Sequence, residues 1–240
     1  MSYSEGMSIV GLEPCVICSG EPARTRPARN GRLLYECARC GLLYRPAADR
    51  PDPEAARRRY LQHRNDPADA GYVAFLGRIV ELTRPHLSPP GHGLDYGSGP
   101  APSLSPLFER LGYTMTDYDP VFAPTELRGP YDLVVSTECW EHFHEAGREI
   151  ARVVELVRPG GVLAVMTELW GPTTDVATWH YTSDPTHTTY YSRRSMDAIA
   201  SRYGLTLVAC DGARCAVYVR SAEVARCGPQ TGQAGSGEIL

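Results

Sequence analysis

Four cysteines near the amino end have the spacing of metal ligands. Cys15-Val16-Ile17-Cys18 and Cys37-Ala38-Arg39-Cys40 are two C-x2-C pairs separated by 18 residues. Such pairs typically form two knuckle turns that hold one tetrahedral zinc ion through thiolates. Two disulfides are one alternative, disfavoured because the chain shows no secretory leader. Thiol redox chemistry is a weaker alternative, because no thioredoxin-like pattern surrounds either pair. We expect a small zinc ribbon over residues 1–45, with zinc in a structural role.

A second group of chemical residues lies in the polar, aromatic segment 168–191. His180, Asp184 and His187 place two imidazoles and a carboxylate within eight residues. Imidazole accepts a proton near neutral pH, which makes these three residues candidates for catalysis. We favour His187 over His180, because the run Asp-Pro-Thr-His resembles a rigid turn that presents its last residue. In the alternative interpretation, both histidines only fasten the segment through hydrogen bonds.

A glycine-rich turn follows an apolar run at Leu94–Pro102, LDYGSGPAP. Gly97 and Gly99 would let the backbone approach a ligand closely, because glycine adopts tight turns without steric cost. The next apolar run ends at Asp119, whose carboxylate can accept hydrogen bonds from both hydroxyls of a ribose, contributing about 1.5–3 kcal/mol. Open α/β sheets gather ligands at the carboxyl ends of their strands. These residues predict a pocket for a nucleotide-type cofactor.

The order of four segments resembles that of the class I S-adenosylmethionine-dependent methyltransferases. The segments are DYGSG at 95–99, the acidic strand end at Asp119, YDLVVS at 131–136 and RPGG at 158–161. The resemblance covers roughly residues 71–220. It implies a Rossmann-like α/β sheet and methyl transfer from S-adenosylmethionine to an oxygen, nitrogen or carbon atom of a small-molecule acceptor. The predicted cofactor contacts are Asp95, Gly97, Ser98, Gly99, Asp119, Thr137 and Glu138.

Three other functions compete with this one. A nicotinamide cofactor would favour a third small residue in the turn, where this chain has Pro102. An RNA methyltransferase, acting on ribosomal or transfer RNA, is the runner-up, because a zinc ribbon that docks RNA also precedes this fold in ribosomal-RNA enzymes. The ribbon region is only weakly basic, however, with 11 arginines against 7 acidic residues over 1–64. A binding protein with a degenerate transferase body is disfavoured by the intact glycines and Asp119.

A carboxylate-rich run follows the fourth predicted strand of the sheet. The similar ubiquinone-pathway O-methyltransferases have a Glu-x-x-Glu-His run at this place, associated with a divalent ion near the acceptor. The resemblance thus makes Glu138, Glu141 and His142 candidate ligands for Mg²⁺ or Mn²⁺, a donor set that is chemically reasonable. It also makes His142 a candidate catalytic residue. In the alternative interpretation, these residues bind no metal. They only begin a helix over 141–157 and form hydrogen bonds on the cofactor side of the pocket.

The spacing of the apolar runs predicts an incomplete version of the family's sheet. Only 11 residues, Pro120–Pro130, separate the second run from the next. One strand–helix–strand crossover alone needs about 10–12 residues, so we predict that the third strand is missing or vestigial. The order should shrink from 3-2-1-4-5-7-6 to 2-1-4-5-7-6. The runs Leu205–Cys210 and Cys215–Arg220 flank an Asp-Gly turn, which predicts an antiparallel last strand.

Composition and segment boundaries complete the prediction. The 240 residues carry a net charge of −4, and all 24 basic residues are arginine. No apolar run approaches the roughly 20 residues that a bilayer requires, so we expect a cytoplasmic protein with no membrane contact. We expect a linker and cleft-covering helices over 46–90 and the methyltransferase domain over 91–220. The glycine-, glutamine- and serine-rich segment 221–240 predicts a disordered tail.

Overall fold

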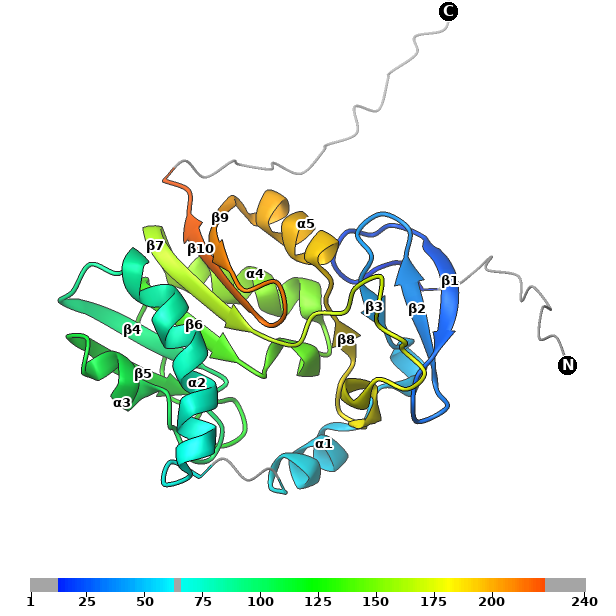
Figure 1. The fold of residues 1–240 in the computed structure, drawn as a ribbon, viewed down its shortest axis with the longest axis horizontal. Helices are drawn as coiled ribbons and strands as arrows, with labels where there is room; N and C mark the ends of the chain where they lie inside the picture. The colour runs from blue at the N-terminus through cyan, green and yellow to red at the C-terminus, as the bar shows by residue number, and fades with distance from the viewer. Residues whose placement is uncertain (1–12, 63–65, 223–240) are drawn as a thin grey trace, which may run out of the picture.

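A six-stranded sheet forms the centre of the computed structural model, which describes residues 13–62 and 66–222 (Figure 1). Its strand order is β5-β4-β6-β7-β10-β9. Strands β5, β4, β6 and β7 are parallel, whereas β10 is antiparallel to both β7 and β9. The strands are β4 (Gly91–Tyr96), β5 (Tyr113–Tyr118), β6 (Tyr131–Thr137), β7 (Val157–Met166), β9 (Leu205–Cys210) and β10 (Cys215–Arg220). The predicted order and the antiparallel last strand are confirmed.

The connection from β5 to β6 explains the missing strand. Its described residues form no helix and no strand, apart from one isolated bridge between Asp119 and Ala123. Three prolines at positions 120, 124 and 130 remove backbone donors that a helix or a strand ladder would need. The chain therefore crosses directly from β5 over β4 to β6.

Helices cover both faces of this sheet. One face packs against α2 (Ala70–Thr83) and α3 (Ser105–Glu109), and the other packs against α4 (Ala146–Leu156) and α5 (Arg193–Tyr203). Alternate residues of β6 point to opposite faces, so Val134 joins the α4 cluster while Leu133 and Val135 join the α2 cluster. Two apolar layers thus hold the strand ends in place.

The cysteine-rich segment forms a second, four-stranded sheet at the side of the first. Its order is β1-β2-β3-β8, from β1 (Pro22–Pro27), β2 (Leu33–Cys37), β3 (Leu43–Tyr44) and β8 (Thr189–Tyr190). Strand β8 belongs to the insertion 168–191, which therefore completes the sheet of the ribbon. Helix α5 lies between the two sheets (Figure 1), and its Arg194 donates to the carbonyls of Ala38 and Arg39.

The predicted helix over 141–157 is wrong at its start. The structure has a single 3-10 turn at Trp140–His142, and α4 begins only at Ala146. The carbonyl of Glu141 accepts a hydrogen bond from the amide of Thr188 at 2.7 Å. Because the insertion before β8 holds this carbonyl, residues 141–145 do not enter the helical register.

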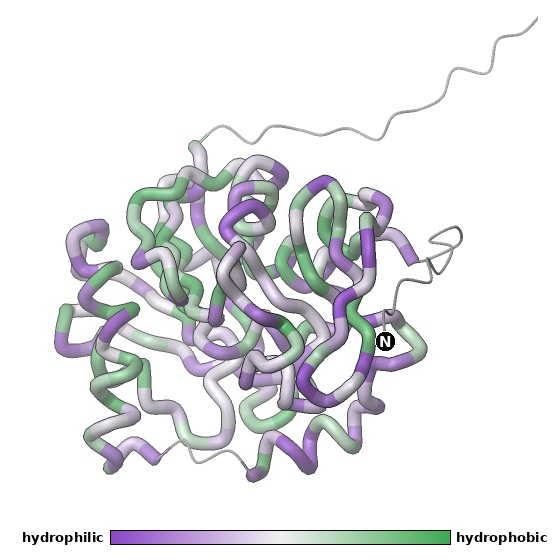
Figure 2. Tube along the Cα trace, turned by 45° about the vertical axis from the view of Figure 1, so that its right-hand side comes forward, coloured by the Kyte–Doolittle hydropathy of each residue, from purple (hydrophilic) through white to green (hydrophobic). Residues whose placement is uncertain are grey.

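Helix α1 (Pro53–Tyr60) follows the ribbon and lies at the bottom of the view, below the sheets (Figure 1). Figure 2 shows hydrophobic and hydrophilic residues alternating along the trace. Among the described residues, no helix combines the length and the apolar composition that a membrane span requires. The predicted tail lies outside the described residues except for Ser221 and Ala222, and so do the first 12 residues of the predicted ribbon.

Candidate active site

A pocket of about 480 Å³ opens at the carboxyl ends of β4, β5 and β6. The turns that follow these strands supply residues 95–100, 119–122 and 137–139 to its wall. Helices α1 and α2 close another side through Tyr60 and Tyr72. All seven predicted cofactor contacts line this pocket, and the pocket lies where an open α/β sheet binds ligands.

The turn after β4 has a shape that requires glycine. Gly97 and Gly99 have φ angles of 87° and 68°, in the left-handed region. A Cβ atom on Gly97 would also collide with the side chain of Cys139. The amide of Gly97 donates to the carbonyl of Tyr118 at 2.8 Å, which ties this turn to the end of β5. At positions 97 and 99, therefore, no side chain stands between the backbone and the pocket.

Two polar atoms beside this turn are buried without a hydrogen-bond partner among the described residues. They are Oδ1 of Asp95 and Oγ of Ser98. Burial, and to a smaller extent the carboxylates of Asp117 and Asp119, raise the pKa of Asp95 to about 8. Leaving such atoms unsatisfied is costly, about 1–3 kcal/mol each. A ligand that brings a positive charge or hydrogen-bond donors to this point would compensate the cost.

Asp119 joins the first two turns of the pocket. Its Oδ1 accepts hydrogen bonds from the amides of Val121 and Phe122, at 2.8 and 3.0 Å, and its Oδ2 accepts from the amide of Gly99 at 3.1 Å. A carboxylate has about four lone-pair positions, so acceptor capacity remains. The side chain is thus oriented by the backbone and is still able to bind a diol.

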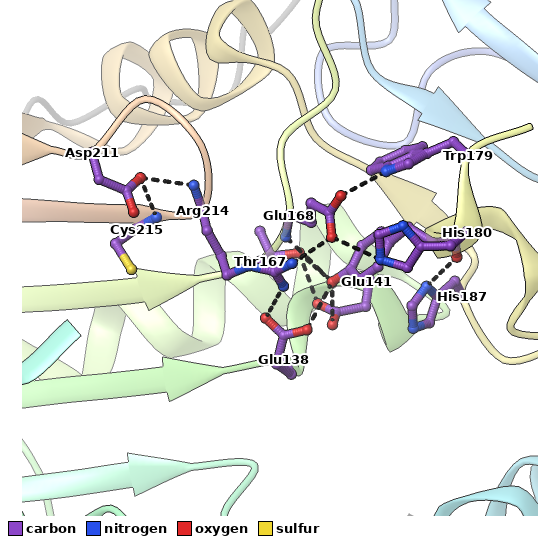
Figure 3. A network of polar contacts seen from close by, with 11 residues as sticks. Glu138, Glu141, Thr167, Glu168, Trp179, His180, His187, Asp211, Arg214 and Cys215 are labelled. Atoms are coloured by element: carbon purple, nitrogen blue, oxygen red, sulfur yellow. Dashed lines mark hydrogen bonds and ion pairs between the residues drawn. The ribbon is translucent and has the colours of Figure 1, made fainter. Parts of the chain in front are cut away.

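Glu138, at the end of β6, lies in a network of polar contacts (Figure 3). It adopts φ 47°, and its Oε1 pairs with Nη1 of Arg214 at 2.9 Å. Arg214 also pairs with Glu168. Burial and, next, the neighbouring Glu141 raise the pKa of Glu138 to about 8 against the opposing effect of Arg214. Glu138, a predicted Mg²⁺ or Mn²⁺ ligand, is therefore engaged by a cationic side chain, and its role as a metal ligand stays a prediction.

Glu141 is fully buried behind Glu138. Its Oε1 accepts a hydrogen bond from the hydroxyl of Tyr181 at 2.5 Å, and its Oε2 accepts from Thr167 at 2.9 Å. Burial raises the pKa of Glu141. Tyr181 belongs to the aromatic insertion that was predicted to wall the acceptor, but its hydrogen bond to Glu141 was not predicted. Thr167, directly after β7, was not predicted to take part in the site.

His142 and His187 meet at the wall of the pocket, with ring centroids 4.7 Å apart. Nδ1 of His187 lies 2.8 Å from the carbonyl oxygen of Tyr181, and Nδ1 of His142 lies 3.3 Å from that of Thr186. Burial lowers the pKa of His187 well below its ordinary value, so the ring is neutral. The ligand atoms of Glu141, His142 and His187 all lie within 4.8 Å of one another.

The other two candidate catalytic residues of the insertion do not line the pocket. The side chain of His180 is 68 % exposed, and its Nε2 lies 3.3 Å from Oε2 of Glu168. Asp184 pairs with Arg59 of α1 at 2.8 Å and accepts hydrogen bonds from the amide and hydroxyl of Thr186. The insertion thus brings one of its two histidines to the pocket and uses Asp184 to fasten itself to α1.

Two residues of the wall were missed because their elements look unremarkable in the sequence. Tyr60 ends α1, which resembles a solvated helix, yet its ring lies edge-on to His142 at 5.0 Å. Phe143 also lines the pocket. Phe143 also belongs to the buried cluster that includes α4. Both give the pocket flat apolar surface near the histidines.

The four amino-terminal cysteines form a compact cluster away from the pocket. The sulfur atoms of Cys15 and Cys40 are 3.6 Å apart, and those of Cys18 and Cys37 are 3.4 Å apart. A disulfide needs about 2.05 Å, whereas thiolates on one tetrahedral zinc ion with bonds of about 2.3 Å lie about 3.8 Å apart. A hydrogen bond from Cys40 lowers the pKa of Cys15 to about 5, favouring a thiolate. The cluster therefore fits zinc.

A family model described as "Methyltransferase domain" matches residues 59–210, which is more than half of the chain. The chain belongs to this family. The matched region includes the three strands whose turns line the pocket and all of the pocket's described lining residues except Pro53 and Ala56. No curated protein matches the sequence of this methyltransferase.

A comparison with solved structures finds one that shares the fold of this methyltransferase and others that resemble it less. One is the 1,6-didemethyltoxoflavin-N1-methyltransferase of Burkholderia thailandensis, with bound 1,6-didemethyltoxoflavin and S-adenosylhomocysteine. Its sequence is 16 % identical to this one, and the TM-score is 0.53. The match covers 83 % of this chain and 100 % of that chain. Another is the magnesium protoporphyrin IX methyltransferase of Synechocystis PCC 6803 with bound S-adenosylhomocysteine. It is 17 % identical with a TM-score of 0.46, over 70 % of this chain and 94 % of that one.

Proposed function

We propose that this enzyme transfers a methyl group from S-adenosylmethionine to an oxygen, nitrogen or carbon atom of a small molecule. The convergence of three strand-end turns on one pocket, with a buried and unpartnered Asp95 carboxyl group at its base, carries the proposal. The similar fold of a methyltransferase with both S-adenosylhomocysteine and a small heterocyclic ligand supports it.

Each turn has a role in holding the cofactor. Asp119 would accept the two ribose hydroxyls, because its carboxylate is already oriented by three backbone amides. Asp95 and Ser98 would bind the ammonium and carboxylate of the methionine portion, which satisfies the two orphaned atoms. The glycine turn and the adjacent Thr137 and Glu138 would complete the wall around the sulfur. Bound S-adenosylmethionine supplies an electrophilic methyl group.

The residues around the histidines form the acceptor end of the pocket. Tyr60 and Phe143 would hold a flat, partly apolar acceptor, and alignment of acceptor and methyl group can account for about 7–11 kcal/mol of the barrier. His187 is neutral, and its Nδ1 donates to a carbonyl, so its Nε2 carries the lone pair. An acceptor that must lose a proton would give it to this nitrogen.

The charges of the pocket restrict the acceptor. Five acidic residues line it, and none of its described lining residues is an arginine. No arginine among these lining residues could pair with a phosphate or carboxylate of the acceptor, so a neutral or cationic acceptor fits better. The same argument makes RNA the less favoured acceptor, because nucleic-acid sites need cationic contacts to phosphates.

Zinc in the cysteine cluster would have a structural role. None of the four cysteines lines the pocket, and three of them pack in the buried cluster that includes α4 and α5. A structural zinc ion contributes about 10–16 kcal/mol of coupled folding free energy in small isolated domains. Zinc would therefore stabilise the ribbon and the strand β8 that it carries.

Transfer of a labelled methyl group tests the function. The enzyme is incubated with methyl-labelled S-adenosylmethionine and, separately, with the small-molecule and RNA fractions of a cell extract. We expect label in a small-molecule product, resistant to ribonuclease, and no label in RNA. Label confined to RNA would replace this proposal with the RNA alternative.

A further inference from the structure

Three side chains at the acceptor end of the pocket come from two distant segments. Glu141 and His142 follow β6, and His187 precedes β8, yet their ligand atoms all lie within 4.8 Å of one another. We propose that these three residues form a second metal site, separate from the cysteine cluster, which takes a divalent transition ion such as Zn²⁺, Co²⁺ or Ni²⁺.

The hydrogen bonds of the two histidines prepare them as ligands. A carbonyl oxygen only accepts hydrogen bonds, so the Nδ1 atoms that contact the carbonyls of Tyr181 and Thr186 carry the protons. In the neutral ring the lone pair is then on Nε2. Metal-binding histidines almost always donate their other ring N–H to a carbonyl, a carboxylate or water in this way, which fixes both the tautomer and the ring orientation.

The carboxylate of Glu141 is oriented in the same manner. Its two described hydrogen-bond donors are the neutral hydroxyls of Tyr181 and Thr167, and Figure 3 shows it between Thr167 and His187. Two of its four lone-pair positions remain for a metal. None of the hydrogen bonds found for Glu141 among the described residues comes from a cationic side chain, whereas Glu138 is paired with Arg214. A bound cation would neutralise the buried charge of Glu141.

The donor set selects the class of metal. Two imidazole nitrogens and one carboxylate oxygen suit Zn²⁺, Co²⁺, Ni²⁺ or Fe²⁺, whereas Mg²⁺ and Ca²⁺ prefer oxygen ligands. Ligands of one ion at about 2.1 Å lie about 3–4 Å apart, so small rotations of the three side chains would close the set.

Three protein ligands leave at least one coordination position open. All three residues line the pocket, so the open position faces its interior. If the proposed function holds, a lone pair on the acceptor's oxygen or nitrogen would occupy that position; with the ion bound, Nε2 of His187 is a ligand and no longer accepts the acceptor's proton. The metal site itself does not depend on the identity of the cofactor.

Cobalt binding to the zinc-loaded full-length enzyme tests the site. One equivalent of Zn²⁺ per chain first fills the four-thiolate cluster and leaves the second site empty; Co²⁺ is then added, and its binding is followed by calorimetry and visible absorption. We expect one further equivalent of metal, with d–d absorption and without the thiolate-to-cobalt charge-transfer band that the cysteine cluster would give.

His187→Ala and His142→Ala should each weaken cobalt binding at least tenfold. His180→Ala is the matched control, because His180 is exposed and outside the site, and it should bind cobalt as the unaltered enzyme does.

Binding of S-adenosylhomocysteine by each variant shows that the fold is retained. Absence of a further cobalt equivalent in the unaltered enzyme would overturn the proposal, as would equal cobalt affinity in both histidine variants or a spectrum with thiolate charge transfer alone. Cobalt uptake without S-adenosylhomocysteine binding would overturn the proposed function and leave the metal site standing.

Discussion

Arg45, directly after the ribbon strand β3, donates a hydrogen bond from Nη1 to the carbonyl oxygen of Pro185 at 2.7 Å, two residues before His187. Its Nη2 donates to the carbonyl of Asp184 at 3.0 Å, and its own amide donates to Thr188 at 2.8 Å. The Arg45 side chain is fully buried. The ribbon therefore clamps the turn that presents His187 to the pocket.

Replacing Arg45 by lysine should loosen this clamp. A single ammonium group cannot reproduce the geometry with which a planar guanidinium donates to two carbonyls. We expect Arg45→Lys to lower the free energy of unfolding by about 1–3 kcal/mol and to lower kcat without weakening the binding of S-adenosylhomocysteine. Urea denaturation, steady-state kinetics and calorimetry measure the three quantities. Arg32→Lys is the control, since Arg32 is exposed. An unchanged kcat in Arg45→Lys would show that the clamp does not position the site.

Removal of zinc should release the same region. Strand β8 pairs with β3, which follows the second cysteine pair, so loss of the metal should expose the amides of Thr189 and Tyr190. Hydrogen exchange with and without a chelator measures this. We expect faster exchange in β1, β2, β3 and β8 and little change in β4 or β5. A chelated enzyme, free of zinc by elemental analysis, with unchanged exchange in β8 would contradict a structural metal.

Cofactor affinity should depend on pH through Asp95. Because the pKa of this carboxyl is raised to about 8 in the free enzyme, an ammonium ligand must bind in exchange for its proton. Affinity for S-adenosylmethionine should therefore rise with pH between 6 and 8, by up to about tenfold per unit. Calorimetry at several pH values measures the slope. Asp95→Asn should bind weakly with a flat profile; a steep profile in that variant would assign the titration to another group.

The stability of the free enzyme should show the opposite dependence. The carboxyl of Asp95 ionises near 3.8 in the unfolded chain and near 8 in the folded one. The folded state therefore holds more protons across this window, and the contribution of Asp95 to stability falls as pH rises through it. Thermal unfolding should show that, above pH 4, Asp95→Asn loses less stability with rising pH than the unaltered enzyme does. If the two proteins lose stability in parallel, Asp95 is not the source.

The two histidines of the insertion should differ in importance. His187 is buried in the pocket wall, whereas His180 is exposed beside Glu168. We expect His187→Ala to lower kcat by about 10²-fold or more, the range of general acid–base catalysis, and His180→Ala to leave it within about twofold of the unaltered enzyme. S-adenosylhomocysteine affinity should stay unchanged in both. Equal activity in the two variants would leave His187 with only a structural role.

The sheet could be predicted from the sequence because its signals are local. The short, proline-containing connection from Asp119 to Tyr131 excludes the third strand, and the Asp-Gly turn at 211–212 marks the hairpin of β9 and β10. The helix α5 begins after Ser192, whose hydroxyl accepts from the amide of Ser195 as the capping pattern requires. Each of these features depends on a few neighbouring residues.

The acceptor end could be predicted only in part, because it depends on contacts between distant segments. His180 and His187 look alike in the sequence, and pairing of β8 with β3 decides which one reaches the pocket. Arg45 resembles a solvated linker residue, yet folding buries it. The helix predicted from Glu141 fails because Thr188, 47 residues later, binds the carbonyl of Glu141.

Calorimetric titration of S-adenosylhomocysteine into the enzyme tests the central claim most directly. We predict one binding site per chain, with affinity reduced by about 10–100-fold in Asp119→Ala through loss of hydrogen bonds to the ribose. Asp132→Ala, at the opposite end of β6, should bind as the unaltered enzyme does. No binding by the unaltered enzyme, or equal affinity in Asp119→Ala, would contradict the account.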